Sequence, residues 1–595
     1  MNKIIEQYKA MHDISDTEWH YLKHPEDRPL PDATAFKDGQ HFLRTLYNQQ
    51  HKEITIMPDY DADGVTSGIY AYYGLQVLGI GKQVNIYFPN ADDGFGVSPT
   101  SVHKAVAQFP NTQVLLTTDN GTSAVEGVKT ANALGLTVLI TDHHEGDIEE
   151  PDALAIINPN RVGDPYPFKG LSGGHVIHKV LWTYMKQVCP DKQEALEMLA
   201  PLVGLSTVAD VMPIQDENHS MVKQALALMN RDDLVNQLGG VIQRHPVLEP
   251  YANGLVALLN VLEQHNKAKR PFTENTFGWV MGPLMNTPRR LTNKPDLSFE
   301  MFLQPSWEDA VKHAHRLIEL NEERKGIVQG SIDALEEMPT YQRFVAAPVA
   351  QSFKTTAGHG IVGIIAGRLS NTYKTPVVVF SEPNDDGLIQ GSGRSPEGFH
   401  ILDILKQIQC AAPTVMESFG GHAAACGVTI KESAWPIFNA YFEQFGAQQT
   451  TIYVEPEINA FPVTFPDPLL KPFGKAPDTI EDTHDAKVYI DAVIELESVA
   501  PFGQGFDPLQ GVITIDLRSI QQQLMGRDKT HIKFKMAFVP FEVIIWSDAK
   551  RISESDDPYI TIQFDFSINE WNGRVSLQGI GKEYVLHNEL AGVTA

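Results

Sequence analysis

The chain has 595 residues, of which 42% are hydrophobic and 20% charged. This ordinary globular composition excludes a disordered, collagen-like or coiled-coil protein, and the length is about four times that of an average domain of ~150 residues. No segment approaches the ~20 apolar residues of a membrane span, and the first 20 residues contain no apolar signal core. Three cysteines cannot build a disulfide framework, so we expect a cytoplasmic protein that does not bind membranes.

The net charge of −27 is the second constraint on function. So acidic a chain is a poor candidate for coating nucleic acid electrostatically. It does not exclude a nuclease, because a metal-centred active site itself needs many carboxylates.

From Ile54 onward, short apolar runs alternate with amphipathic helices, after a polar and mostly helical segment at 1–50. We expect strands at 54–57, 83–90, 114–116, 138–140 and 153–160, and helices at 65–80 and 123–134. Strands that alternate with helices of 10–15 residues are typical of a parallel sheet with crossover helices.

The remainder of the chain is predicted to contain three further parts. Residues 216–338 are mostly helical, and 306–338 form one long helix that often bridges lobes in such proteins. A second α/β block begins near Tyr341 and ends at the glycine-rich segment 418–427, and short β segments from about Gln448 suggest an oligonucleotide-binding barrel. The expected domains are 1–225 with an N-terminal helical extension, 226–338 as a helical connector, 339–447, and 448–595.

Acidic and imidazole side chains follow several of the predicted strands. The edge formed by the carboxyl ends of parallel strands is where open α/β sheets bind ligands. Oxygen and imidazole ligands suit Mn²⁺ or Mg²⁺, and two such ions would activate water and stabilise charge at phosphorus. A solvated turn or a helix cap explains a single Asp-x-Asp pattern equally well, but the ordered set favours a metal site. Its members are Asp59, Asp61, Asp63, Asp119, Asp142, His143, His144 and, later in the chain, Asp210.

Four motifs together resemble the DHH phosphoesterases. They are Asp59–Gly64 (DYDADG), Thr118–Gly121 (TDNG), Thr141–His144 (TDHH) and Val208–Val211 (VADV). Further segments are similar to the RecJ family of single-strand exonucleases within that superfamily: INPN at 157–160, NEERK at 321–325, GSGRSPEGFHILDIL at 391–405, FGGHAAACG at 419–427 and PFGQG at 501–505.

The resemblance implies a DHH domain, a long linking helix, a DHH-associated α/β domain and an oligonucleotide-binding barrel. It also implies a role for each matched residue. Asp59 would orient a ligand, and His144 would lie beside the second metal or the scissile phosphate. Two Mn²⁺ or Mg²⁺ ions would be held by Asp61, Asp63, Asp119, His143 and Asp210, which with His144 form the expected catalytic set. Phosphate would be bound by His144, Asn286, Arg290, Ser392, Arg394 and His422, although a surface arginine or a buried histidine is the ordinary alternative for the last two.

The implied activity is metal-dependent 5′→3′ hydrolysis of single-stranded DNA to mononucleotides, in DNA repair or recombination. We expect a monomer, with a single-strand-binding protein or a helicase as candidate partners. Two alternatives stay open: a DHH-type phosphodiesterase acting on short RNA or on linear or cyclic dinucleotides, and a non-catalytic scaffold. The barrel is expected to guide the strand through the basic residues Lys533, Lys535, Lys550, Arg551 and Arg574. Candidates for base stacking are Phe534, Trp546 and Trp571, each of which is equally suited to the barrel core.

The sequence also departs from the family pattern at three positions. Ala91 and Leu284 stand where the family commonly has arginines, and Arg289 stands where it has a glycine. None of these is a proposed metal ligand. We therefore expect a divergent member in which recognition of the 5′ phosphate is altered more than catalysis.

Overall fold

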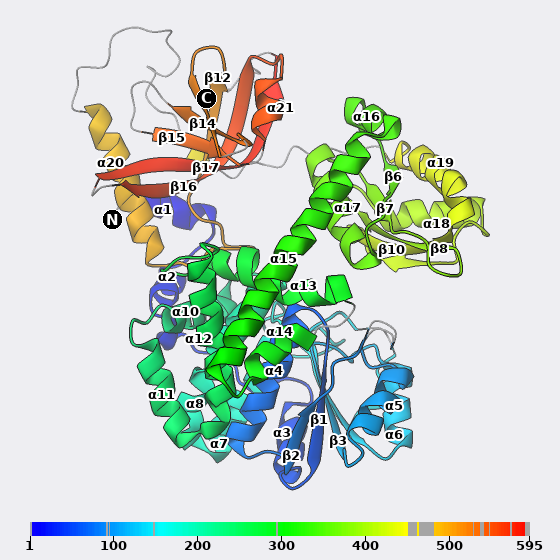
Figure 1. Cartoon of the computed structure of the whole chain (residues 1–595). Coiled ribbons are helices and arrows are strands. Elements are labelled where there is room, and N and C mark those ends of the chain that lie inside the picture. Colours follow the sequence, from blue (N-terminus) through cyan, green and yellow to red (C-terminus); the bar gives the residue numbers. More distant parts are fainter. Residues whose placement is uncertain are drawn as a thin grey trace. The chain divides into compact units, whose positions relative to one another are not determined.

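The structure is a computed structural model that describes residues 3–90, 93, 96–146, 149–292, 296–449, 461–462, 481–526, 529–535, 541–546, 548–571 and 574–588. Figure 1 shows the whole chain coloured from the N-terminus to the C-terminus. The chain divides into two compact units, one of 31–212 and 224–454 and the other of 1–30, 213–223 and 455–595. No helix in the described ranges is long and apolar enough to cross a membrane.

The larger unit begins with a parallel sheet of five strands in the order β2-β1-β3-β4-β5. Every residue of β3 is buried, as expected for a strand covered on both faces by helices. The strands are β1 (Glu53–Pro58), β2 (Gln83–Ile86), β3 (Val114–Thr118), β4 (Thr137–Thr141) and β5 (Ala155–Ile157).

Helices cover both faces of this sheet (Figure 1). On one side, α5 (Pro99–Gln108) and α6 (Val125–Ala133) pack on Met57, Leu115 and Val138 in one apolar cluster. On the other side lie α3 (Gly39–Asn48), α4 (Ala62–Leu78) and α7 (Gly173–Val188). Helix α4 is buried on nearly all sides, because α7 and α9 (Ala200–Ala209) pack against it. The first turns of α4 and α7 thus meet the last turn of α9 at one end of the sheet.

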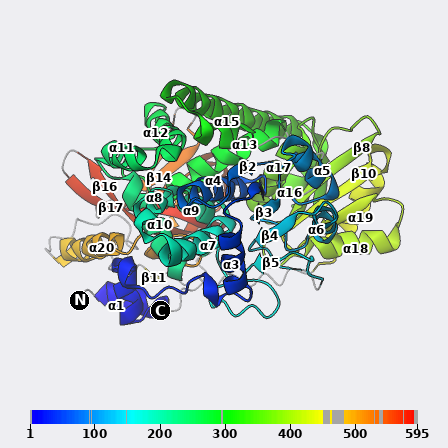
Figure 2. The same cartoon turned by 90° about the horizontal axis from the view of Figure 1, so that it is seen from below.

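A helical region follows, and its long helix confirms the predicted one. Helix α15 (Trp307–Glu336) runs without a break, and Ser306 caps its start by accepting a hydrogen bond from the Asp309 N–H over 3.1 Å (Figure 2). The other helices are α8 (Gln193–Glu197), α10 (Asp216–Met229), α11 (Leu234–Arg244), α12 (Glu249–Gln264), the π-helical turn η6 (Thr276–Met281), α13 (Gly282–Thr292) and α14 (Asp296–Glu300).

The second α/β block has a mixed sheet in the order β6-β7-β8-β10-β9, with β6 and β7 parallel and the other pairs antiparallel. One apolar cluster joins α16 and α17 to the sheet, and another joins α18 and α19 to it. The elements are α16 (Pro339–Ala346), β6 (Gln351–Lys354), α17 (His359–Tyr373), β7 (Val377–Phe380), β8 (Leu388–Arg394), α18 (Ile401–Ala411), β9 (Ser418–Gly421), β10 (Ala425–Lys431) and α19 (Trp435–Gly446).

The smaller unit is built on a seven-stranded sheet in the order β11-β12-β16-β17-β15-β14-β13. Strand β12 alternates buried and half-buried residues, which is the period-two pattern of a strand with one face in the core. Its elements are β11 (Phe461–Pro462), α20 (Glu481–Glu497), β12 (Gln510–Asp516), β13 (Gln521–Met525), β14 (His531–Lys535), β15 (Phe541–Ile545), α21 (Ala549–Ser553), β16 (Tyr559–Trp571) and β17 (Arg574–His587).

The N-terminal helices α1 (Lys3–Met11) and α2 (Asp16–Lys23) belong to this smaller unit. Ile5 and Tyr8 are buried in its core, and the Tyr8 hydroxyl donates to the Asp507 carbonyl over 2.5 Å. The sequence analysis assigned residues 1–50 to the catalytic domain, whereas the structure groups 1–30 with the C-terminal sheet. The predicted fold class is confirmed, and the exact domain boundaries stay a prediction.

Candidate metal centre

The predicted site residues meet at the carboxyl ends of the first sheet. The backbone N–H groups of Asp59, Asp119 and Asp142 each donate to the carbonyl of the last residue of the next strand, over 3.1, 3.0 and 3.0 Å. The sheet ladder therefore continues one residue beyond the strands. This fixes the backbone from which the acidic side chains project.

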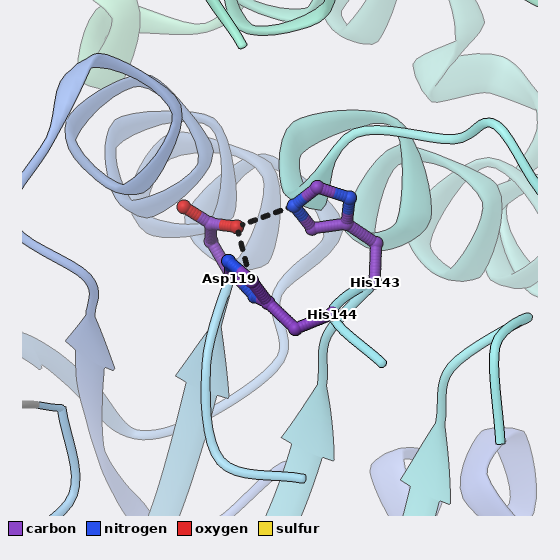
Figure 3. A group of neighbouring side chains, drawn as sticks. All are labelled: Asp119, His143 and His144. Atoms are coloured by element: carbon purple, nitrogen blue, oxygen red, sulfur yellow. Dashed lines mark ion pairs between the residues drawn. The ribbon is translucent and has the colours of Figure 1, made fainter. Parts of the chain in front are cut away.

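His143 lies at the centre of the cluster. Its Nε2 is 3.0 Å from Oδ1 of Asp119, 3.4 Å from Oδ2 of Asp210 and 3.6 Å from Oδ2 of Asp63. Figure 3 shows the rings of His143 and His144 both directed at the same oxygen of the Asp119 carboxylate. Three overlapping groups of side chains have ligand atoms within 4.8 Å of one another: Asp63 with His143 and Asp210, Asp119 with His143 and His144, and Asp59 with Asp61 and Asp119.

The donor set fits divalent cations. Oδ1 of Asp119 and Nε2 of His143 are both buried, and neither has a hydrogen-bond partner in the described structure. Buried polar atoms are rarely left unsatisfied, so an oxygen and a nitrogen that face each other in this way are suited to hold a cation. Burial and the neighbouring Asp63 raise the pKa of Asp119 well above its usual range, and the same causes raise the pKa of Asp210 to about 8. A cation would relieve this repulsion.

Two site residues have left-handed backbone conformations. Asp119 has φ of 63°, and Val211, directly after Asp210, has φ of 56°. Aspartate adopts this conformation at modest cost, but it is unusual for a β-branched valine. Such strain persists where the surrounding structure imposes it, often at functional sites. The strained Val211 directly follows Asp210, one of the three carboxylates close to His143.

The loop between β1 and α4 is held by hydrogen bonds from two directions. Asp61 caps α4, because its Oδ1 accepts from the Gly64 N–H over 3.0 Å. Oδ1 of Asn286 on α13 accepts from the Ala62 N–H, also over 3.0 Å. A Cβ atom on Gly64 would lie 2.3 Å from the carbonyl of Asp59, so only glycine fits this turn. Asn286 was predicted to bind phosphate; its observed contact is with the acidic loop.

Asp142 holds the two histidines that follow it, a role that was not predicted for it. Its Oδ1 accepts from the backbone N–H groups of His143 and His144 over 2.7 and 3.1 Å, and lies 2.8 Å from Nδ1 of His144. The hydrogen bond to Asp142 raises the pKa of His144 to about 9. The side chain of His144 is 55% exposed, so it presents a cation at the edge of the cluster. The sequence could have indicated this role, because the Asp142 carboxylate stands directly before the two histidines.

The INPN segment braces the two histidines from behind. The side-chain amide of Asn158 donates to the carbonyl of His144 over 2.9 Å, and that of Asn160 donates to the carbonyl of His143. The segment therefore fixes the backbone of both histidines rather than contacting a ligand itself.

Several arginines gather between the cluster and the second block within the larger unit. Burial and the nearby Arg324 and Arg394 lower the pKa of Arg290 to about 10, and Asp61 acts in the opposite direction. Nη1 of Arg394 donates to Oγ of Ser392 over 3.0 Å. Among the described residues, Arg290 and Arg394 form no ion pair with a carboxylate, so a positive region lies close to the acidic cluster.

Gly363 on α17 packs closely against this positive region. A Cβ atom at Gly363 would lie 3.0 Å from Oγ of Ser392 and 3.2 Å from Nη2 of Arg394, so a larger residue would displace both. His422 is different: it is exposed at the turn between β9 and β10, with its N–H bonded to the Ala425 carbonyl over 2.8 Å. Its role in phosphate binding stays a prediction.

The predicted stacking residues of the C-terminal sheet have different environments. Phe534 is fully buried in the core, which excludes it as a surface for stacking bases. Trp546 is 47% exposed and lies 4.9 Å from the ring of His531 in an edge-to-face contact. The side chains of Trp571 and Arg574, and all of Ala91, lie outside the described residues.

Two lysines of this sheet are paired with the same carboxylate, which offsets only one of their two positive charges. Nζ of Lys533 lies 2.5 Å from Glu542, and Nζ of Lys535 lies 3.8 Å from it. Lys550 and Arg551 lie on α21, and the Arg551 guanidinium packs 5.7 Å from the centroid of Tyr584.

Comparison with known proteins accounts for nearly the whole chain. Residues 53–206 match the N-terminal domain of the DHH family, 343–447 match the DHHA1 domain, and 483–583 match the RecJ OB domain. The chain is a RecJ-like member of the DHH family. Its predicted membership is thereby confirmed.

The relatives of this RecJ-like chain cover it almost from end to end. The single-stranded-DNA-specific exonuclease RecJ of Haemophilus influenzae is 28% identical over 568 residues, which are 91% of this chain and 89% of that protein. RecJ of Thermus thermophilus, solved with Mn²⁺, has a TM-score of 0.71 at 20% identity, covering 99% of this chain and 76% of that one. A second structure of it, with Mg²⁺, has a TM-score of 0.62 at 18% identity, covering 97% and 74%.

Proposed function

We propose that the chain is a metal-dependent exonuclease that hydrolyses single-stranded DNA in the 5′→3′ direction and releases mononucleotides. The observation that carries the proposal is the acidic and histidine cluster in a chain that also contains the DHHA1 and RecJ OB domains. Curated relatives that match about nine-tenths of the chain are named single-stranded-DNA-specific exonucleases. The polarity and the product rest on the family resemblance.

Two Mn²⁺ or Mg²⁺ ions are the proposed cofactors. The ligands would be Asp61, Asp63, Asp119, His143 and Asp210, and the position of Asp59 allows it to bind an ion directly as well as to orient a ligand. When bound, the ions would activate water and stabilise the charge that develops at phosphorus. Asp119 belongs to two of the three groups, and the two oxygens of its carboxylate could hold neighbouring ions, whereas Nε2 of His143 could hold only one.

The surrounding side chains would bind and orient the strand. His144, held by Asp142, would face the scissile phosphate from the exposed edge of the cluster. Arg290, Ser392 and Arg394 would bind a terminal phosphate, since guanidinium groups bind phosphate oxygens in pairs. The RecJ OB domain would hold the strand further from its end, through stacking contacts that tolerate any base sequence.

The substrate class separates this proposal from the second candidate, a phosphodiesterase for short RNA or dinucleotides. The experiment measures the rate of hydrolysis of four substrates in the presence of Mn²⁺, each at the same concentration of phosphodiester bonds. The substrates are a long single-stranded DNA, the matching duplex, a single-stranded RNA and a dinucleotide. The proposal expects the long single-stranded DNA to be degraded fastest, with label lost from its 5′ end first. Rapid cleavage of the dinucleotide with an intact long strand would establish the second candidate instead.

A further inference from the structure

Ser206 lies between two of the proposed metal ligands that come from different elements. It is fully buried on α9, and its Oγ donates to Oδ1 of Asp63 over 2.5 Å. Its backbone carbonyl accepts from the N–H of Asp210 over 3.1 Å, which ends the helix there. Ser206 therefore contacts the carboxylate of Asp63 through its hydroxyl and the backbone of Asp210 through its carbonyl.

The other hydrogen bonds to Asp63 come from the start of α7. The N–H of Gly173 donates to Oδ2 over 2.7 Å, and the N–H of Gly174 donates to Oδ1 over 2.9 Å. The two glycines permit this approach, because a Cβ atom would lie 2.5 Å from Cβ of Asp119 at Gly173 and 2.4 Å from Oγ of Ser206 at Gly174. Asp63 is thus clamped by α7 on one side and by α9 on the other.

The hydroxyl of Ser206 is oriented by its neighbours. Its Oγ lies 2.7 Å from Oγ of Ser172, which caps α7 and lies 3.2 Å from Oγ1 of Thr207. Ser206 donates to the Asp63 carboxylate, so its oxygen can accept a hydrogen bond from Ser172. The Thr207 hydroxyl donates to the Val203 carbonyl over 2.9 Å, so towards Ser172 it can only accept, and Ser206 and Thr207 share the Ser172 proton.

We propose that Ser206 is a positioning residue that fixes the Asp63 carboxylate relative to Asp210, and so sets the spacing of the Asp63–His143–Asp210 group for metal binding. The inference rests on the proposed metal function. Hydrogen bonds to charged groups are the stronger ones, and removing this one leaves Asp63 with its two backbone donors. The variant Ser206→Ala should therefore fold, but with the carboxylate of Asp63 less well placed for the ion.

The test compares Mn²⁺ binding to the full-length wild type, to Ser206→Ala and to the control Ser352→Ala by isothermal titration calorimetry. Ser352 is equally suited to alanine substitution: it is 1% exposed and its Oγ donates to Asn439 over 2.6 Å, but it lies on β6, in the second α/β block. We expect Ser206→Ala to bind Mn²⁺ about tenfold more weakly, which corresponds to the loss of one hydrogen bond to a charged group. Ser352→Ala should bind it as the wild type does.

Thermal unfolding without metal distinguishes positioning from mere stability. If the melting temperatures of both variants fall by similar amounts and both variants bind Mn²⁺ like the wild type, the role of Ser206 is structural and the inference is wrong. If Ser206→Ala does not fold, Ser206→Cys replaces it, because a thiol keeps the shape with a weaker donor; unchanged Mn²⁺ affinity there would also overturn the inference. A wild type that binds no Mn²⁺ would instead overturn the proposed metal centre itself.

Discussion

The guanidinium carbon of Arg289 lies 4.4 Å from the centroid of the Tyr60 ring. Tyr60 stands between Asp59 and Asp61 in the acidic loop, and Arg289 is mostly buried on α13. Arg289 occupies a position where the family pattern has a glycine, so the contact belongs to this chain. It ties α13 to the loop that carries two of the proposed ligands, two residues before Ala62, whose N–H donates to Asn286.

A double-mutant cycle with Arg289→Leu and Tyr60→Leu measures this contact. Cation–π pairs contribute about 0.5 kcal/mol at exposed sites and about 2 kcal/mol when desolvated, so we expect a coupling free energy of unfolding towards the upper value. Arg289→Lys should retain part of it. Denaturant unfolding of the four proteins gives the number, and additive effects of the two single substitutions would show that the pair does not interact.

Asp119→Asn should abolish metal-dependent turnover without unfolding the chain. Asparagine tolerates the left-handed backbone at this position, whereas Asp119→Ala adds a conformational cost. Mn²⁺ should raise the melting temperature of the wild type and leave that of Asp119→Asn unchanged, because a ligand stabilises only a protein that binds it. An equal rise in both proteins would place the ion away from Asp119.

Arg394→Ala should weaken discrimination between 5′-phosphorylated and 5′-hydroxyl strands more than it slows hydrolysis. Because Ala91 replaces an arginine of the family pattern, we expect the initial discrimination to be modest. The measurement compares kcat/KM on the two strands for the wild type, for Arg394→Ala and for the control Arg368→Ala. Arg368 is an exposed arginine on α17 that donates a hydrogen bond to Gln329. Equal losses on both strands would argue for a structural role of Arg394.

Trp546→Ala should lower the affinity for a long single strand about 5- to 150-fold, since stacking of one base contributes about 1–3 kcal/mol. Of the two predicted stacking residues whose side chains the structure describes, Trp546 is the exposed one. Trp307→Ala is the matched control, because Trp307 is similarly exposed but begins α15. Fluorescence anisotropy with a labelled oligonucleotide and EDTA present gives both affinities; unchanged binding by Trp546→Ala would exclude this surface.

The strands and their acidic ends could be predicted because both depend on local pattern. Apolar runs such as β3 followed by Asp119 identify a buried strand and its carboxyl end, and parallel topology then brings separate ends together. Contacts across long separations could not be predicted in this way. The Ser206 hydroxyl reaches Asp63 from 143 residues away, and nothing near either residue in the sequence marks the pair.

Burial within the smaller unit was equally hard to predict. Phe534 and Trp546 both lie in strand-like segments rich in aromatic and basic residues, yet one is fully buried and the other half exposed. Phe534 lies within β14, which is paired on both sides, whereas Trp546 lies just beyond the last residue of β15. The grouping of Tyr8 with this core depends on a contact with Asp507, again far along the chain.

The most direct measurement follows degradation of a 5′-phosphorylated single-stranded DNA by the wild type and by Asp119→Asn, first in EDTA and then after Mn²⁺ is added in excess. The account predicts no cleavage by either protein in EDTA, release of mononucleotides by the wild type once Mn²⁺ is present, and none by Asp119→Asn. Cleavage by the wild type in EDTA with no residual metal, or Mn²⁺-dependent cleavage by Asp119→Asn at the wild-type rate, would contradict it.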